Sequence, residues 1–225
     1  MFEVTTVWKK LYPQSAIGIL ALQGVANPSI STTLDQEKNA LEHELRQRYA
    51  GFSRAELRAL PSVAPYVTYY KRFKKTYHVL QQLESVALKG KSIPHTAALV
   101  EAMFMAELSN HLLTAGHDLD VVQGDVSVTV STGRETYTGI GGRELNTKED
   151  DMMITDESGI LSSIVYGPDQ RTRIMPETTR VLFTVYAPDG IHIQLLWHHL
   201  NTLRRLAAMI SPEAEVVEEL ILSAG

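Results

Sequence analysis

The fold is decided by the stretch Leu99-Val-Glu-Ala-Met-Phe-Met-Ala-Glu-Leu-Ser-Asn-His-Leu-Leu113, which is apolar on nearly every side. A helix with this pattern is buried all round, at the centre of its domain. From Val126-Ser-Val-Thr-Val130 onward the hydrophobic period changes to two, which is typical of half-buried strands. A buried helix followed by a run of strands predicts the α+β class.

Helices and strands are expected on both sides of this junction. Segments rich in Val, Ile and Thr predict strands, and Leu or Tyr at helical spacing predicts helices. Ser211 followed by Pro212 is a helix start signal, so we also expect a terminal helix. In chain order the expected elements are strands at 2–8 and 16–25, helices at 34–49, 53–60, 77–88 and 94–113, strands at 126–130, 135–140, 152–155, 160–165 and 180–186, and helices at 193–210 and 211–223.

The composition is that of a folded, cysteine-free chain. Its 225 residues are 44% hydrophobic and 21% charged, and no repeat or long linker divides them, so we expect a single domain over residues 1–225. The absence of cysteine excludes disulfides, a thiol nucleophile and cysteine-ligated metal sites. No apolar run reaches the ~18 residues of a membrane span, and no basic segment precedes a hydrophobic one at the N-terminus. A cytoplasmic protein with no membrane partner is expected.

Charge is distributed unevenly along the chain. The net charge of −5 argues against a general nucleic-acid binder, but residues 45–91 hold ten basic and two acidic residues, and residues 117–225 hold seventeen acidic and eight basic ones. This asymmetry favours a polyanionic partner on one side, and a solvated helical face is the alternative. The run from Tyr66 to Tyr77 adds tyrosines that are available for base stacking, and a place for them in the core is the alternative. The predicted RNA contacts are Lys71, Arg72, Lys74, Lys75, Lys89 and Lys91.

Familiar cofactor and metal motifs are missing from the sequence. Gly139-Ile-Gly-Gly142 lacks the lysine and the following helix of a phosphate-binding loop. His198 and His199 are adjacent, so on a helix they point about 100° apart and do not chelate together. We therefore expect no metal and no cofactor.

Three polar groups are candidates for a site. Thr114–Asp120 is a dense polar cluster expected as a loop, in which His117 is the best general base and Asp118 or Asp120 fixes its tautomer. Ordinary turn chemistry of the aspartates is the alternative. The second candidate is the polar loop Gly167–Arg173. The third is Glu101, which opens an apolar stripe either as a site carboxylate or as a charge favoured by the helix dipole.

These segments together carry a resemblance to a known family. The chain resembles the tRNA-editing module of the phenylalanyl-tRNA synthetase β chain over roughly residues 60–190. The likeness implies a β-β-α layered sandwich, as a freestanding module, with N-terminal strands and helices (1–59) and C-terminal helices (191–225) packed on it. The matching segments are Lys89–Pro94, Leu99–Glu101, Gly116–Asp120, Gly124–Asp125, Ile154–Ile160, Gly167–Ile174 and Thr178–Phe183.

Some residues of the family pattern differ in this sequence. The spacing from Glu101 puts the family's editing histidine at Ala115 and its aromatic residue at His117. Phe104 stands where the family has asparagine. The family's editing glutamate falls within 169–172.

The resemblance implies RNA binding and ester hydrolysis. The expected function is that of a tRNA-binding, trans-editing-type hydrolase, which removes a wrong amino acid from an aminoacyl-tRNA by water attack on the ester. A non-catalytic module that binds RNA or an aminoacyl ligand is the alternative, and an RNA-independent hydrolase of small amino-acid esters or amides is a third. The predicted catalytic residues are His117, Asp118, Arg171 and Thr172, and the predicted ligand pocket is Glu101, Asp120, Asp169 and Gln170.

Overall fold

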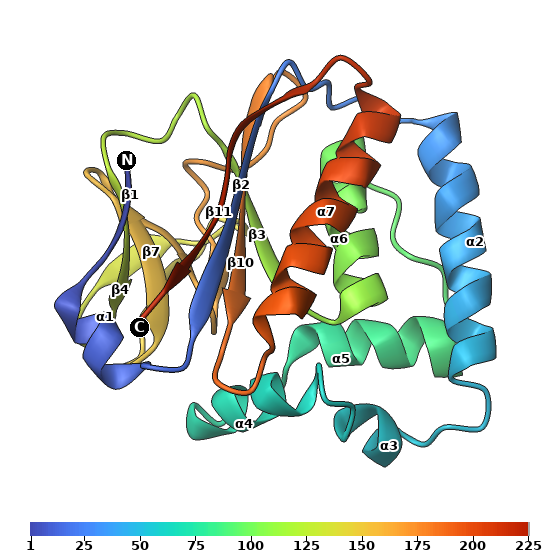
Figure 1. Cartoon of the computed structure of the whole chain (residues 1–225), viewed down its shortest axis with the longest axis horizontal. Helices are drawn as coiled ribbons and strands as arrows, with labels where there is room; N and C mark the ends of the chain where they lie inside the picture. Colours follow the sequence, from blue (N-terminus) through green and yellow to red (C-terminus); the bar gives the residue numbers. More distant parts are fainter. Residues whose placement is uncertain (225) are drawn as a thin grey trace.

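Two β-sheets and a layer of helices lie one on another (Figure 1). The computed structural model describes residues 1–224. The first sheet faces the second sheet, and α2 (Thr32–Arg48), α6 (Ala98–Asn110) and α7 (Ile193–Ile210) lie on the far side of the second sheet. This arrangement confirms the predicted α+β fold and its β-β-α layers.

The sheets are formed by segments that are far apart in the sequence. In the first sheet β1 (Phe2–Val4) runs parallel to β4 (Val126–Val130), and the other pairs are antiparallel; the second sheet is wholly antiparallel. The first sheet continues with β7 (Met152–Asp156), β8 (Gly159–Ser163) and β9 (Gly167–Pro168), and the second has the order β11 (Glu215–Ser223), β2 (Ala16–Gln23), β10 (Arg180–Ala187) and β3 (Leu113–Asp118). A separate hairpin consists of β5 (Thr136–Thr138) and β6 (Glu144–Asn146).

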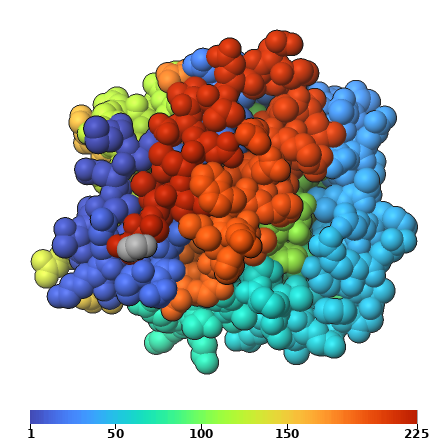
Figure 2. Space-filling view, in the orientation of Figure 1, coloured from blue at the N-terminus to red at the C-terminus, as the bar shows by residue number. Residues whose placement is uncertain are grey.

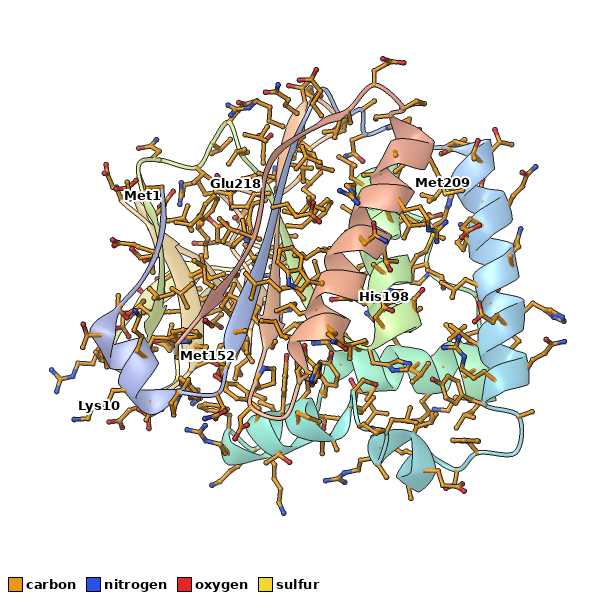
Figure 3. The ribbon with its side chains drawn as sticks, in the orientation of Figure 1. Met1, Lys10, Met152, His198, Met209 and Glu218 are labelled. Carbon is orange, nitrogen blue, oxygen red and sulfur yellow. The ribbon has the colours of Figure 1, made fainter. Side chains whose placement is uncertain are left out.

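The smaller helices lie at the edges of these layers. Helix α1 (Thr6–Leu11) follows β1, and its Lys10 points into solvent (Figure 3). Three helices run across one end of the molecule: α3 (Arg54–Arg58), α4 (Ala64–Arg72) and α5 (His78–Leu83), which continues into a π-helical turn, η1 (Glu84–Leu88). Across residues 1–224 no helix has the length and apolar character needed to cross a membrane.

Helix α6 is buried nearly all round, as its sequence predicts. Leu99, Met105 and Leu108 have at most 2% of their surface exposed, and α6 packs against α7, α2 and β3. Met152 of β7 lies between the two sheets and has no exposed surface (Figure 3). The space-filling view shows α7 and β11 across the middle of one face of the molecule, between the N-terminal segment and α2 (Figure 2).

Two predicted elements are wrong. The segment 211–223 is a turn followed by the strand β11 rather than a helix, because residues 215–223 pair with β2, with one bulge between Val216 and Glu218. Ser211 ends α7, and its hydroxyl accepts a hydrogen bond from the Ala26 N–H at 2.8 Å. The predicted strand at 2–8 stops at Val4, because Thr5 caps α1 and Trp8 buries its indole in the core. In both cases a tertiary contact outweighs the local pattern.

Truncating α6 tests its place in the core. Met105→Ala and Leu108→Ala should each lower the free energy of unfolding by about 2–5 kcal/mol, because each leaves a cavity in a close-packed layer. Ile140, which is 56% exposed, gives the control. Ile140→Ala should change the free energy of unfolding by less than ~0.5 kcal/mol. Chemical denaturation measures both, and a Leu108→Ala protein as stable as the wild type would contradict the assignment.

Candidate functional site

Three of the predicted site residues form a hydrogen-bonded chain inside the molecule. His117 Nδ1 lies 2.8 Å from the Thr172 hydroxyl, and that hydroxyl donates to the Asp169 carboxylate. Because the hydroxyl proton goes to Asp169, the imidazole must donate from Nδ1, which leaves the lone pair on Nε2. Among residues 1–224, Nε2 of His117 has no hydrogen-bond partner.

Arg171 closes one side of this cluster. Its guanidinium lies 2.8 Å from Asp156 and 3.6 Å from Asp169, and it donates to the Val121 carbonyl at 3.1 Å. The buried Asp156 also accepts the backbone N–H of Gln123. The guanidinium is therefore engaged by carboxylates and a carbonyl of the protein itself.

Burial sets the protonation of this cluster. It lowers the pKa of His117 to about 3, and the neighbouring Arg171 adds to the effect, so the imidazole is neutral at pH 7. Burial also raises the pKa of Asp169. His117 and Thr172 have no exposed surface. Their contact with a substrate stays a prediction.

The predicted polar loop at 114–120 is mostly a strand. Residues Leu113–Asp118 form β3, which pairs with β10, and only Leu119 and Asp120 continue into the turn. Asp118 accepts the Thr178 hydroxyl at 2.6 Å and the Asp120 N–H at 3.0 Å, which is the turn chemistry of the alternative. Asp120 also pairs with Arg180 at 2.9 Å.

Two predicted pocket residues lie apart from the His117 imidazole. Glu101 is buried in the first turn of α6, and its carboxylate lies 2.7 Å from the ammonium of Lys38 on α2. The same ammonium is 3.0 Å from Asp35 and 3.3 Å from His95, so a cation already occupies the one group of residues spaced like metal ligands in the described chain. Gln170 donates its N–H to Thr138 of the β5–β6 hairpin.

The predicted RNA-binding residues are exposed, but three of them contact other side chains of the protein. The Lys75 ammonium lies 5.1 Å from the ring centre of Tyr166. The Arg72 guanidinium lies 5.5–5.6 Å from the ring centres of Tyr12, Tyr69 and Phe73. Lys89 pairs with Glu84 at 2.8 Å. Lys71, Lys74, Lys75 and Lys91 form no ion pair within residues 1–224. The predicted base stacking is wrong for the tyrosines Tyr66, Tyr69, Tyr70 and Tyr77, because all four are buried.

The sequence analysis missed a cavity of about 390 Å³ between α5, η1 and α6. It opens beside the segment 91–94, and the π-helical turn forms part of its wall, as such turns often do at functional sites. Both apolar and polar side chains line the cavity. The apolar ones are Val86, Ile93, Pro94, Phe104 and Leu108, and the polar ones are His78, Gln81, Gln82, Ser85, Lys91 and Ser92.

His78 is the one imidazole that lines this α5–α6 cavity. Burial lowers its pKa to about 4, so it is neutral at pH 7. The Gln82 side-chain oxygen is buried in the same wall and accepts no hydrogen bond from residues 1–224. The sequence contains a sign of this site, which is a polar stripe on an otherwise apolar helix. The stripe consists of residues at positions i, i+3, i+4 and i+7, namely His78, Gln81, Gln82 and Ser85.

The fold and the cavity define an α+β module built from two stacked sheets and a helical layer. The chain belongs to the B3/4 domain family, whose model matches residues 66–207. The match runs from α4 to α7 and includes β4, β7, β8 and β9 of the first sheet and β3 and β10 of the second.

Comparison with known proteins confirms the resemblance found in the sequence. The chain is 29% identical over 69 residues to the phenylalanine–tRNA ligase beta subunit of Mycoplasma genitalium, and 31% identical over 88 residues to that of Tropheryma whipplei. These segments are 31% and 38% of this chain and 9% of each relative, so the chain matches only a small part of the relatives' length.

A solved structure shares the fold. It is an N-terminal fragment of the phenylalanyl-tRNA synthetase beta subunit from Pyrococcus horikoshii, with a TM-score of 0.50 and 11% identity. The alignment covers 98% of this chain and 53% of the fragment. At this identity the likeness concerns the fold alone.

The buried histidines predict how stability depends on pH. Their pKa values in the folded protein lie below the ordinary value of ~6.5. As the pH falls below ~6.5, the unfolded chain therefore binds more protons than the folded one, and the free energy of unfolding decreases. Glu107 acts in the opposite direction, because burial raises its pKa to about 8, and its contribution is lost as the pH rises through that value. The melting temperature should therefore peak near about pH 7. The histidines are His78 and His111, with pKa values of about 4, and His117 and His199, at about 3.

Glu107→Gln is the matched control for this profile. Glutamine keeps an oxygen that accepts the Thr114 N–H, now at 2.8 Å, but it does not titrate. The fall in melting temperature above pH 7 should flatten, and the acid side should remain. A wild-type melting temperature that stays constant between pH 7 and 5 would show that these histidines are not buried in neutral form.

Proposed function

We propose that this chain is a tRNA-binding, trans-editing-type hydrolase that holds an aminoacyl group in the α5–α6 cavity. The observation that carries the proposal is a neutral imidazole, His78, in the wall of a cavity with both apolar and polar linings. Membership of the B3/4 family and the similarity to phenylalanine–tRNA ligase beta subunits support tRNA as the partner.

The cavity suits an aminoacyl group in size and chemistry. Its volume of about 390 Å³ lies within the range of ~300–1,000 Å³ that is usual for small-ligand sites. Val86, Phe104 and Leu108 offer an apolar surface to an amino-acid side chain. Lys91 brings a positive charge that suits the phosphates of an attached RNA.

The proposed reaction is the attack of water on the ester carbonyl. The neutral His78 accepts a hydrogen bond from this water and orients it, and its low pKa makes it a weak base. The attacking water forms the new bond to the acyl carbon and releases one proton to the surrounding solvent. When the tetrahedral intermediate collapses, the bond between the acyl carbon and the ribose oxygen breaks, and that oxygen takes up a proton from solvent. An ester needs less assistance than an amide, so an oriented water with hydrogen-bond donors such as the side-chain amides of Gln81 and Gln82 suffices.

In this proposal the His117 cluster supports the fold. Its hydrogen bonds join β3 to the segment 169–172, and the pairing of Arg171 with Asp156 ties that segment to β7. The earlier assignment of His117, Asp118, Arg171 and Thr172 to catalysis remains a separate prediction, and the same assay tests it.

A specific observation also favours the non-catalytic alternative. Ala115, at the position of the family's editing histidine, lies directly opposite Thr184 in the pairing of β3 with β10. The buried Thr184 hydroxyl has no hydrogen-bond partner among the described residues. A module that lost this imidazole keeps an aminoacyl pocket and the RNA contacts without turnover.

A deacylation screen over a panel of charged tRNAs tests the proposal. The wild type should hydrolyse at least one of them without added metal or nucleotide, and His78→Gln should lower the rate by about 10²–10⁴-fold. His43→Gln, a change at an exposed histidine of α2, is the matched control and should be neutral. His117→Gln, Asp118→Asn and Arg171→Gln belong in the same series.

Each outcome selects one reading. Turnover that survives His78→Gln but falls with His117→Gln or Arg171→Gln would move the chemistry to the buried cluster. Binding without turnover on any charged tRNA would establish the non-catalytic module. Turnover of small amino-acid esters with no preference for tRNA would establish the RNA-independent hydrolase.

A further inference from the structure

A second cavity, of about 120 Å³, is lined by four basic side chains. It lies between α3, α4 and the start of α5, and its cations are Arg54, Arg58, Lys71 and Lys75. We propose that this basic cavity binds a backbone phosphate of the RNA whose aminoacyl end enters the α5–α6 cavity. The choice of RNA as the source of the phosphate rests on the proposed function.

Local structure brings the four cations together. Arg54 and Arg58 are the first and last residues of α3, one helical turn apart, and a capping box between Ser53 and Glu56 fixes the start of that helix. Lys71 lies in the last turn of α4. The chain then reverses and brings Lys75 back beside the helix end, where its N–H donates to the Tyr70 carbonyl at 3.0 Å.

The turn that places Lys75 contains a lysine in the left-handed region. Lys74 has φ = 57°, at the helix end where glycine is usually favoured. Its side chain is exposed and does not line the basic cavity. Lys74 therefore provides a variant that changes the local charge without touching the proposed phosphate contacts.

The positive charge of the cavity is mostly uncompensated. Arg54 pairs with Glu84 at 3.1 Å, and Glu84 also pairs with Lys89. Arg58, Lys71 and Lys75 form no ion pair within residues 1–224, and no carboxylate lines the cavity. Like charges held around a concave surface attract anions strongly, and a phosphate relieves their mutual repulsion.

The size and the donors fit one phosphate group. With a volume of about 120 Å³, the basic cavity is smaller than the α5–α6 cavity of about 390 Å³. Two arginines offer forked donors for the oxygens of a phosphate, and two lysines add point charges.

The basic cavity and the α5–α6 cavity lie on two faces of one helix. Tyr77 and Leu80 line the basic cavity, whereas His78 and Gln81 line the other. A helix with its side chains is ~10–12 Å across, so the two cavities are separated by that order of distance. A single-stranded RNA end that crosses α5 places its aminoacyl group in the α5–α6 cavity and a phosphate of a preceding nucleotide in the basic cavity.

Salt-dependent binding of tRNA to the full chain tests the inference. In the double variant Arg58→Gln/Lys71→Gln the affinity at low salt should fall about tenfold, and the slope of log K against log salt should shrink by about 1. The matched control is Lys9→Gln/Lys10→Gln on α1, which removes the same charge from side chains that do not line the basic cavity and should leave the slope unchanged. Lys74→Gly should have a smaller effect than the double variant.

Two further measurements separate this inference from the proposed function. An aminoacyl adenosine without phosphate should be hydrolysed equally by the wild type and by Arg58→Gln/Lys71→Gln, which supports both. No hydrolysis of any ester, together with a reduced slope in the double variant, supports the phosphate site and refutes the hydrolase. A wild-type slope in the double variant overturns the phosphate site. Micromolar binding of inorganic phosphate without any tRNA binding overturns RNA as the source.

Discussion

The structure depends on the second sheet being covered on both faces. The first sheet packs on one face and α6 and α7 on the other, so Ile17–Leu22 of β2 and Val181–Ala187 of β10 are buried residue after residue. Such strands have no solvent side and read as continuous apolar runs. The same constraint explains why α6, held between the sheet and its helical neighbours, is apolar on nearly every face.

Polar groups trapped in these layers stay neutral or take a protein partner. Glu107 keeps its proton because burial raises its pKa to about 8, and His199 stays neutral between Thr114 and Asn110. Glu101 instead remains buried beside the Lys38 ammonium. The interior therefore offers hydrogen bonds that order the layers, and the open cavities of the proposed site lie at the helical end around α5.

The sequence predicted the periodic elements well and the polar segments poorly. Helix α7 was predicted at its observed bounds and α2 within two residues, because each buries an apolar stripe that is visible in the spacing. Strand β11 was missed because its pairing with β2 depends on residues almost 200 positions away. The sequence predicts a loop at Thr114–Asp118 because polar side chains are usually exposed. Here they are buried, since they bond to partners such as His199 and Thr172 that are distant in the sequence. His78 was missed because only the packed structure shows a cavity beside it.

The part of the second sheet around Ala115 and His117 is closed to solvent. Ala115, His117 and Thr184 point to the same face of the second sheet, since Ala115 and His117 are two residues apart on β3 and Thr184 lies opposite Ala115. Two buried polar atoms on that face, Nε2 of His117 and the Thr184 hydroxyl, have no partner among the described residues. Unsatisfied groups of this kind cost about 1–3 kcal/mol each, so this face of the sheet lowers the stability of the fold. Chemistry that uses an imidazole needs a place where water and substrate can reach it, and in the described structure the wall of the α5–α6 cavity meets that condition at His78.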